Sequence, residues 1–386
     1  MSRTVWHVSE YPRFVGGIEI NLHTQAQGLK SKGFQQVLLF QGQEESDSRF
    51  LSPFNKAFAV RTLKDIELAA KENPPDAILV QKPFSSWMIP QLLKIAPLIR
   101  FIHDHDLYCP RRHKYFPLSQ RICHEVAGKA CIGHGCLLGR SSKGLFSILN
   151  LSERLRDLRV HRSAVKLIAN SHYVRNELIQ NGLSASKIEV LHPLPGDLGT
   201  ETKPYPKGEP TVLFTGQLLR GKGPDLLLKA VSRMKSKSIR VIFAGDGHMR
   251  PELENLTTRY KLHDHVRLLG RVGAAEISAL LAQAHIAAVP SRWAEPFGMV
   301  GLEAMAAARP VVAFSVGGIS EWLWHGINGL GAPEADVETF AQHLDWLLRH
   351  PETGKELGEN GRSLLERDYR YKDYIEKLES IILQIC

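Results

Sequence analysis

The sequence predicts an α/β protein with two Rossmann-like, doubly wound domains that face each other across a cleft. Short apolar strands alternate with amphipathic helices, and the alternation starts again in the second half of the chain. A stretch at 192–210, rich in Pro, Gly, Lys and Glu, separates the halves as a linker. The chain has 386 residues, which is long enough for two domains of ordinary size.

In the first half, apolar residues recur at helical spacing from Ile18 to Leu29 and Gly33 follows as a stop, so a helix is expected at 18–32. In the second half, helices are expected at 224–234 and 300–308. The strands are expected at 4–8, 36–40, 77–80, 99–103, 211–214, 240–244, 266–269, 286–290 and 310–313. The predicted domains are 1–200 and 201–365, with a C-terminal helix at 366–386.

Composition excludes several classes of protein. Hydrophobic residues make up 43% and charged residues 23%, values typical of globular chains, so disordered and fibrous proteins are excluded. No apolar run approaches the ~18 residues of a membrane-spanning helix. The N-terminus lacks the apolar stretch of a secretory signal, and a cytoplasmic protein is therefore expected.

The formal net charge of +9 lies almost entirely in one region. Residues 94–166 contain 14 Lys or Arg and 5 Asp or Glu, while the rest of the chain is balanced. Such an excess attracts an anionic partner, although a solvated basic face is an equally good interpretation. Nucleic acid is disfavoured because aromatic residues that could stack on bases are sparse there (Tyr108, Tyr115, Phe116).

Four cysteines lie in an expected insertion at about 106–150 of the first domain. They are Cys109, Cys123, Cys131 and Cys136, whereas the fifth cysteine, Cys386, ends the chain. Four thiolates can hold a structural zinc ion, but the spacing lacks paired Cys-x2-Cys motifs. A zinc site and free or redox-linked cysteines are therefore both consistent with the sequence.

The segment from Glu295 to Glu303 carries the most specific chemical signal. It reads E-P-F-G-M-V-G-L-E and places one carboxylate before a helix and a second on that helix. The free amides at the helix start, those of Gly298, Met299 and Val300, favour a phosphate. One carboxylate could bind sugar hydroxyls and the other a ribose diol, or both could be ordinary helix and surface charges. No Gly-x-Gly-x-x-Gly motif is present, which disfavours a dehydrogenase.

With the sequences A-M-A-A-A-R-P-V-V-A at 304–313 and V-G-G-I-S-E at 316–321, this segment resembles the Glu-x7-Glu region of family 4 glycosyltransferases, which have the GT-B fold. Further motifs follow in the order of that family along nearly the whole chain. They are Gly16-Gly17, A-N-S-H-Y-V-R at 169–175 with Gly182, Thr215-Gly216, Lys222-Gly223, A-G-D-G at 244–247 and Leu269-Gly270.

The resemblance implies a retaining, metal-independent hexosyltransferase that uses a UDP- or GDP-linked nucleotide-diphospho-sugar. It implies catalytic roles for Glu295, which would bind the transferred sugar, for His103, and for Lys222, which would neutralise the leaving diphosphate. Glu303 would bind the donor ribose. The remaining donor contacts that it implies are Gly16, Gly17, Gly216, Arg220, Arg271, Val272, Phe297, Gly298, Met299 and Val300.

One position departs from the family pattern. Gln217 stands where the family commonly has an arginine that pairs with the diphosphate, and an amide cannot replace that charge. Arg220 could compensate. Asp104-His105-Asp106 spells an Asp-x-Asp motif, but a metal-bound donor is disfavoured because side-chain cations serve this purpose in the GT-B context.

The resemblance also implies a glycan or lipid-linked acceptor, in the assembly of surface polysaccharide or glycolipid. The basic segment continues through Arg154, Arg156, Arg159 and Arg162, the last three at the spacing of one helical face, and could dock on an anionic membrane at the cytoplasmic side. The C-terminal helix would cross back to the first domain, and the cleft would close on the donor. The alternative is a non-catalytic nucleotide-sugar-binding or scaffold protein with a zinc-stapled basic insertion, an interpretation that Gln217 favours.

Overall fold

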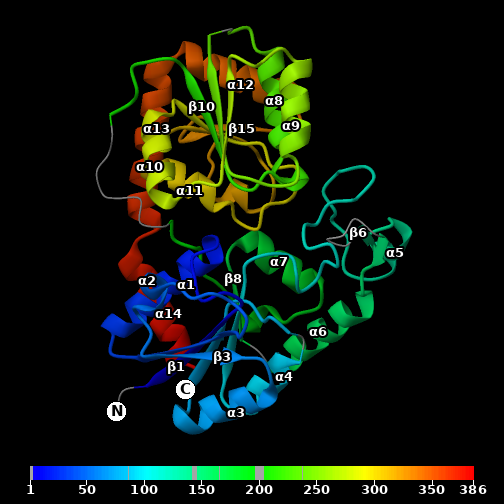
Figure 1. Cartoon of the computed structure of the whole chain (residues 1–386), viewed down its shortest axis with the longest axis vertical. Helices are drawn as coiled ribbons and strands as arrows, with labels where there is room; N and C mark the ends of the chain where they lie inside the picture. The colour runs from blue at the N-terminus through cyan, green and yellow to red at the C-terminus, as the bar shows by residue number, and fades with distance from the viewer. Residues whose placement is uncertain (1–2, 86, 141–145, 165, 196–203, 237) are drawn as a thin grey trace. The chain divides into compact units, whose positions relative to one another are not determined.

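The computed structural model describes residues 3–85, 87–140, 146–164, 166–195, 204–236 and 238–386. The chain forms two compact units (Figure 1). Unit 1 comprises Met1–Arg112, His124–Gly196 and Tyr371–Cys386, and unit 2 comprises His113–Cys123 and Asp197–Arg370. The expected boundary at residue 200 lies outside the described residues. The short segment His113–Cys123 belongs to unit 2, although the sequence analysis placed the whole insertion in the first domain.

The described part of unit 1 is built on a seven-stranded parallel sheet with the order β3-β2-β1-β4-β5-β8-β9. β1, β4 and β5 are buried along almost their whole length, because helices cover both faces of a doubly wound sheet. The strands are β1 (Thr4–Ser9), β2 (Gln35–Gln41), β3 (Lys56–Val60), β4 (Ala77–Val80), β5 (Leu98–Ile102), β8 (Lys166–Ala169) and β9 (Ile188–Val190). The four predicted strands of this half are β1, β2, β4 and β5, and β3, β8 and β9 were not predicted.

The α-helices of unit 1 are α1 (Gly17–Ser31), α2 (Ser48–Leu51), α3 (Leu63–Glu72), α4 (Met88–Leu92), α5 (Lys129–Gly133), α6 (Leu151–Ala164), α7 (His172–Gln180) and α14 (Tyr371–Leu383). The C-terminal helix α14 lies beside α1 (Figure 1). The two helices approach closely at Gly28, where a Cβ atom would stand 2.2 Å from Cδ1 of Ile375. A glycine at this position therefore allows α14 to pack on unit 1.

Unit 2 has, in its described residues, a six-stranded parallel sheet with the order β12-β11-β10-β13-β14-β15. Its strands are β10 (Thr211–Thr215), β11 (Arg240–Ala244), β12 (Val266–Gly270), β13 (Ile286–Val289), β14 (Val311–Phe314) and β15 (Gly329–Ala332). Its α-helices are α8 (Pro224–Arg233), α9 (Arg250–Arg259), α10 (Ala274–Gln283), α11 (Met299–Ala306), α12 (Val337–Arg349) and α13 (Pro351–Asp368). Figure 1 shows α8 and α9 on one side of this sheet and α10 and α13 on the other. The prediction of two doubly wound α/β sheets is confirmed.

The strand orders locate where a ligand is expected in each unit. In an open parallel sheet, ligands bind outside the carboxyl ends of the strands, at the point where the strand order reverses. This point lies between β1 and β4 in unit 1 and between β10 and β13 in unit 2. The loops that leave these strands are therefore the first places to look for a functional site.

The cysteine-containing insertion has little regular structure of its own. It contributes α5 and a two-stranded antiparallel sheet of β6 (Leu138–Arg140) and β7 (Phe146–Ile148). Residues 141–145 of the expected insertion lie outside the described ranges. No helix among the described residues combines the length and the hydrophobicity that crossing a bilayer requires.

Candidate active site

The loop after β13 carries Glu295, and two glycines of a later loop hold its backbone in place. The amide of Gly318 donates a hydrogen bond of 2.7 Å to the carbonyl oxygen of Glu295. A Cβ atom on Gly318 would lie 2.3 Å from the carbonyl oxygen of Pro296, and Gly317 adopts a φ of 57°. Side chains at these positions would push the loops apart, so the glycines fix the backbone from which Glu295 projects.

The Phe297 side chain supports this loop from inside the unit. The side chain is buried, and the indole Nε1 of Trp322 donates a hydrogen bond of 2.7 Å to the Phe297 carbonyl. Trp322 packs against α11 at Gly301, where a Cβ would lie 2.0 Å from Cη2 of the indole. Phe297 was predicted as a donor contact, and the structure gives its side chain a packing position.

Lys222 and Glu295 form the central ion pair of unit 2. The Lys222 ammonium lies 2.7 Å from Oε1 and 3.0 Å from Oε2 of Glu295, and Ser291 donates a hydrogen bond of 2.5 Å to the same Oε1. The ammonium also lies 4.9 Å from the centroid of the Trp293 ring, within the range of a cation–π contact. Burial opposes ionisation, but the Lys222 charge and these hydrogen bonds bring the pKa of Glu295 below its ordinary value. Glu295 is thus a buried anion.

Helix α11 presents open backbone amides close in sequence to this pair. Gly298 caps the helix with a left-handed backbone, at a φ of 88°. Within the described chain, the amides of Gly298, Met299 and Val300 donate no hydrogen bond. Unpaired amides and the helix dipole favour an anion at such a position.

Glu303 lies one turn into α11 and is partly buried. Its carboxylate makes no hydrogen bond to any residue that the structure describes. Burial raises the pKa of Glu303 to about 7, and the nearby charge of Lys222 offsets only part of this effect. A carboxylate kept from water without a protein partner retains its full capacity to accept hydrogen bonds from a ligand.

The other predicted donor contacts of unit 2 follow the carboxyl ends of β10 and β12. Gly216, at a φ of 134°, and the exposed Gln217 come directly after β10. Arg220 forms ion pairs with Asp225 and Glu252, so its charge is already balanced. Arg271 is exposed and Val272 partly exposed, directly after β12.

A hairpin formed by residues 113–123 was not anticipated in unit 2. Tyr115 and Ile122 form an antiparallel bridge, and the Ile122 amide donates a hydrogen bond of 2.8 Å to Oε1 of Glu334. The His113 ring lies 5.9 Å from the ring of Trp293, which makes the cation–π contact with the Lys222 ammonium. The hairpin therefore contributes to the surroundings of the Lys222 site. No sequence signal tied it to the second half of the chain.

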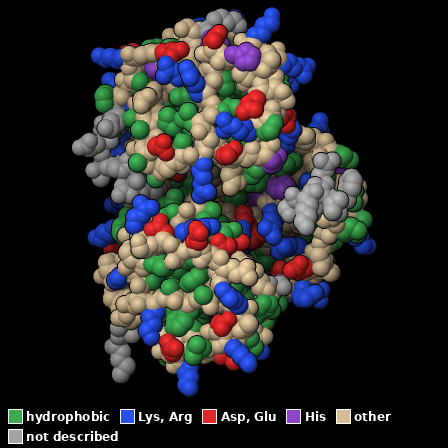
Figure 2. Space-filling view, viewed as in Figure 1, with side chains coloured by type: hydrophobic (Ala, Val, Ile, Leu, Met, Phe, Trp, Pro, Cys, Tyr) green, Lys and Arg blue, Asp and Glu red, His purple; other side chains and the backbone are tan. Residues whose placement is uncertain are grey.

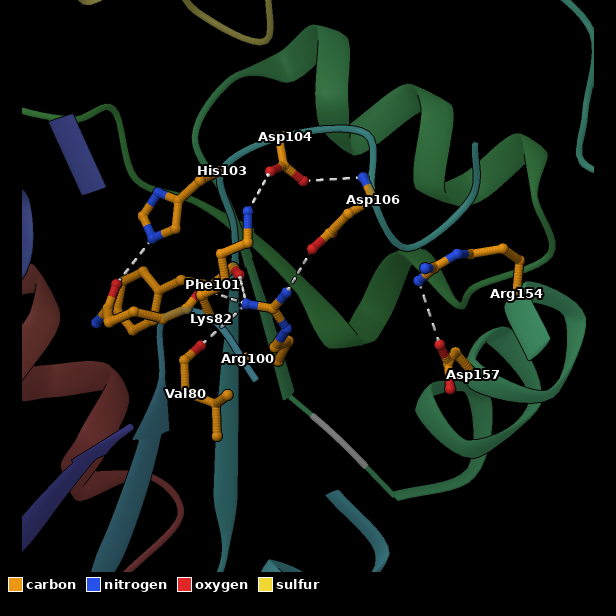
Figure 3. A network of polar contacts seen from close by, with 10 residues as sticks. Val80, Lys82, Arg100, Phe101, His103, Asp104, Asp106, Arg154 and Asp157 are labelled. Carbon is orange, nitrogen blue, oxygen red and sulfur yellow. Dashed lines mark hydrogen bonds and ion pairs between the residues drawn. The ribbon is translucent and has the colours of Figure 1, made fainter. Parts of the chain in front are cut away.

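In unit 1, a polar cluster follows the carboxyl ends of β4 and β5 (Figure 3). Lys82 forms an ion pair of 3.1 Å with Asp104, and Arg100 one of 3.5 Å with Asp106. Burial works against the charges, yet Asp104 raises the pKa of Lys82 and Lys82 lowers the pKa of Asp104. Burial and the neighbouring Asp104 raise the pKa of Asp106. Each carboxylate of the Asp-x-Asp motif thus faces a cation.

His103 lies at the edge of this cluster (Figure 3). Its Nε2 makes a hydrogen bond of 2.8 Å to Oε1 of Gln81, and its ring stacks on Phe101 with an interplanar angle of 9°. Burial, followed by the charge of Arg100, lowers the pKa of His103 to about 3, so the imidazole is neutral at physiological pH.

The predicted glycine loop lies at the reversal point of the unit 1 sheet. Gly17 begins α1 and Gly16 caps it, donating a backbone hydrogen bond of 3.0 Å to the carboxylate of Glu19. Burial raises the pKa of Glu19, and the charge of Lys82 is among the effects that lower it. The structure therefore places Gly16 and Gly17 where the loop after β1 meets α1, and β1 pairs with β4, the strand that Lys82 follows.

The three cysteines of unit 1 are not gathered as the zinc prediction requires. All four cysteines are described, and no three of them bring their sulfur atoms within coordinating distance. Cys109, Cys131 and Cys136 are buried in unit 1, whereas Cys123 belongs to the hairpin of unit 2. The cysteines of unit 1 serve as small buried side chains in this arrangement.

The basic stretch predicted for the first domain lies on α6. Arg156, Arg159 and Arg162 are exposed, while Arg154 pairs with Asp157 at 3.5 Å. Arg162 also donates a hydrogen bond of 2.8 Å to the carbonyl of Asn181. Figure 2 shows basic side chains interspersed with acidic ones on the visible face of each unit, so the positive charge is not a continuous sheet there.

Two family models match the chain in succession. The model described as Glycosyltransferase Family 4 matches residues 15–194, and the model described as Glycosyl transferases group 1 matches residues 200–364. An uncharacterized glycosyltransferase of Methanocaldococcus jannaschii is 32% identical over 52% of this chain, which spans only 55% of that relative. A second from the same organism is 27% identical over 88% of this chain and 87% of its own length.

Solved structures resemble the whole chain. HepE of Anabaena, in complex with UDP and glucose, matches with a TM-score of 0.74 at 16% sequence identity. The match covers 99% of this chain and 100% of HepE. At this level of identity the likeness concerns the fold.

Proposed function

Because this chain belongs to the family 4 glycosyltransferases and has the GT-B fold, we propose that it transfers a hexosyl group from a nucleotide-diphospho-sugar to a glycan or lipid-linked acceptor. The observation that carries the proposal is the ion pair of Lys222 with the buried Glu295 at the reversal point of the unit 2 sheet, followed by the open amides of α11. A cation, a carboxylate and free amides match a diphosphate that bears a sugar.

Each part of this site has a proposed role. The α11 amides and Lys222 bind the diphosphate, Glu303 accepts hydrogen bonds from the ribose hydroxyls, and Glu295 binds the transferred sugar. The backbone at Arg271 and Val272 contacts the base. The UDP complex of HepE supports a UDP-linked donor, with a GDP-linked donor as the alternative.

The proposed reaction retains the configuration of the anomeric carbon and uses no catalytic metal. The oxygen of the acceptor hydroxyl forms a bond to C1 on the face from which the diphosphate departs. The C1–O bond to phosphate breaks, and the departing oxygen takes the acceptor proton. The charge of the leaving diphosphate is stabilised by Lys222 and by the α11 amides, which lie in place before the reaction.

Thermal stability in the presence of nucleotides tests the donor site. A ligand at 100 times its dissociation constant stabilises the folded protein by about 2.7 kcal/mol, which a melting curve resolves. We expect UDP and UDP-sugars, or the GDP series, to raise the melting temperature and Glu303→Gln to reduce this shift. Glu356→Gln, an exposed change on α13, is the matched control. If no nucleoside diphosphate or nucleotide-sugar stabilises the protein, the proposal that this site binds a nucleotide-sugar is contradicted.

We further propose that unit 1 docks on anionic membranes at the cytoplasmic face, where a lipid-linked acceptor resides. The exposed arginines of α6 support this, as do apolar side chains in the insertion that are 61–83% exposed: Ile132, Leu138 and Ile148. Cosedimentation with vesicles containing phosphatidylglycerol should be lost when Arg156 and Arg159 are changed to Glu. The same reversal at Arg250 and Arg259 of unit 2 should leave it intact, and equal binding by both variants would exclude docking through α6.

The rival interpretation is a non-catalytic binding protein, and Gln217 is the residue that favours it. The two functions differ in what Glu303→Gln does. An enzyme loses most transfer activity while its melting temperature without ligand stays near that of the wild type. A cellular function that persists unchanged in this variant would favour the scaffold.

A further inference from the structure

A buried chain of polar side chains connects the C-terminal helix α14 to His103 in unit 1. Gln81 donates a hydrogen bond of 2.6 Å from Nε2 to Oε1 of Gln25 on α1, and its Oε1 contacts Nε2 of His103 at 2.8 Å. The Nε2 of Gln25 donates to the hydroxyl of Tyr374 at 2.7 Å and to Oδ1 of Asn21 at 2.9 Å. The Tyr374 hydroxyl donates to the same Oδ1 at 2.8 Å. We call Asn21, Gln25, Gln81 and Tyr374 the relay.

All four relay residues are buried, with exposed fractions between 0% and 5%. Placing amides and a phenol in a core costs desolvation free energy, and well-packed apolar side chains would avoid that cost. The relay offsets the cost only because its members bond to one another. Burial also raises the pKa of Tyr374, so its hydroxyl keeps the proton that it donates. A network of this kind specifies orientation, and the side chain at its end is His103.

The relay has a direction. Because the Gln25 amide group donates to Tyr374 and Asn21, its carbonyl oxygen must accept from Gln81. The Nε2 of Gln81 is then the donor to Gln25, and the Gln81 carbonyl oxygen faces His103. A carbonyl can only accept, so His103 carries its proton on Nε2. In the described chain the Nδ1 of His103 makes no hydrogen bond, whereas its Nε2 contacts Oε1 of Gln81.

We propose that Tyr374 and Gln81 are positioning residues for His103, which the relay holds as its Nε2–H tautomer so that Nδ1 accepts a hydrogen bond from a hydroxyl of the bound sugar. The ligand half of this inference rests on the proposed glycosyl transfer, whereas the tautomer half does not. The inference also gives α14 a task beyond packing. This helix follows directly on the last residue of unit 2 and supplies the hydroxyl that ends the relay.

The tautomer can be measured without substrate. In protein labelled with 15N-histidine, two-bond 1H–15N correlations at pH 7 distinguish the Nε2–H from the Nδ1–H form, and His103→Asn assigns the signals. We expect pure Nε2–H in the wild type and a mixture in Gln81→Met, which removes the acceptor. Gln81→Glu, which restores an acceptor oxygen, should return the Nε2–H form. Nδ1–H in the wild type, or Nε2–H unchanged in Gln81→Met, would overturn the proposal.

A hydroxyl on the same helix provides a matched control. Tyr374→Phe removes the relay hydroxyl, whereas Tyr371→Phe removes the hydroxyl of a residue that is 48% exposed. Loss of one hydrogen bond from the relay should weaken nucleotide-sugar binding about three- to tenfold in Tyr374→Phe. Binding of the nucleoside diphosphate alone should not change, because the relay acts on the sugar. Tyr371→Phe should match the wild type for both ligands.

The outcomes separate this inference from the proposed function. Equal weakening of both ligands in Tyr374→Phe indicates general loosening of the unit and contradicts a positioning role. If no nucleotide-sugar binds the wild type, the proposed function fails. In that case, the 15N spectra still decide whether the relay fixes the tautomer of His103. Should Gln81→Met fail to fold, the spectrum of Tyr374→Phe is compared with that of Tyr371→Phe, and identical spectra refute the relay.

Discussion

The ammonium of Lys222 lies 2.7 Å from Oε1 of Glu295, so the cation proposed to bind the departing diphosphate is held by the carboxylate proposed to bind the sugar. Only 4% of the Glu295 side chain is exposed, compared with 25% for Lys222. The Lys222 charge therefore stabilises the buried, ionised Glu295 carboxylate, while the lysine side chain itself remains partly exposed to solvent. A donor can approach the lysine from its exposed side without first separating the pair.

Removal of the lysine should therefore destabilise the protein more than removal of the carboxylate charge. Lys222→Met leaves a buried carboxylate without its cation, a change that typically costs about 3–5 kcal/mol. Adding Glu295→Gln should recover most of the free energy of unfolding but not the transfer activity. Denaturant unfolding of the two single variants and the double variant measures this coupling. An unfolding free energy that falls further in the double variant would contradict it.

Glu303 should make both stability and donor binding depend on pH. The folded protein holds the proton up to about pH 7, whereas the ordinary pKa is 4.5, so the folded state binds more protons between these values. The free energy of unfolding should thus fall as pH rises from 4.5 through 7, by on the order of 2 kcal/mol, and Glu303→Gln should remove this slope. Donor affinity should rise over the same range, because the ionised carboxylate is the stronger acceptor. Melting curves with and without nucleotide from pH 4.5 to 8 test both effects.

Gln217→Arg should strengthen binding of the diphosphate. Gln217 is exposed directly after β10, where an added guanidinium can reach an anion without being buried. A charge-assisted hydrogen bond to phosphate contributes about 1.5–3 kcal/mol, equivalent to roughly ten- to a hundredfold in affinity. Calorimetric titration with UDP or GDP checks the gain, and Gln217→Lys separates charge from bidentate geometry. Unchanged affinity in both variants would mean that the diphosphate does not lie near β10.

Gly301→Ala tests the packing of Trp322 against α11, behind the loop that carries Glu295. The added methyl group would overlap the ring of Trp322, with three indole carbons within 2.4 Å of it, and the Trp322 side chain is itself buried. Overpacking of this kind costs typically about 1–3 kcal/mol. Gly133→Ala, where a Cβ meets no atom within 4 Å, is the control and should be neutral. Equal melting temperatures of the two variants would show that Trp322 moves freely.

Most of the central strands of each sheet could be predicted from the sequence, whereas β3, β8, β9 and β15 were missed. β4 and β13 are buried on both faces and read as continuous apolar runs. The edge strand β3 is largely exposed and gives no such signal. The candidate site on the loop after β13 and on α11 could be proposed from the sequence because Glu295 and Glu303 lie close together in a recognisable motif.

The relay and the cysteines show why the remainder was missed. Gln25 and Tyr374 are 349 positions apart, and their pairing depends on how α14 packs on α1. The one available signal was local, since Asn21 and Gln25 occupy buried positions of an amphipathic helix where polar residues are costly. The zinc prediction assumed that cysteines close in sequence converge. In the structure, Cys123 belongs to unit 2, whereas the other three cysteines belong to unit 1.

Because the hairpin 113–123 belongs to unit 2 while its flanks belong to unit 1, neither unit is a continuous piece of chain. A fragment of residues 197–370, the obvious choice for recombinant expression, would lack the hairpin whose Ile122 amide bonds to Glu334 and the His113 ring beside Trp293. A gene fusion or domain exchange that joins the two halves at residue 200 would therefore separate the proposed donor site from residues 113–123, which pack beside it. Expression of the whole chain therefore keeps the Lys222 site together with residues 113–123.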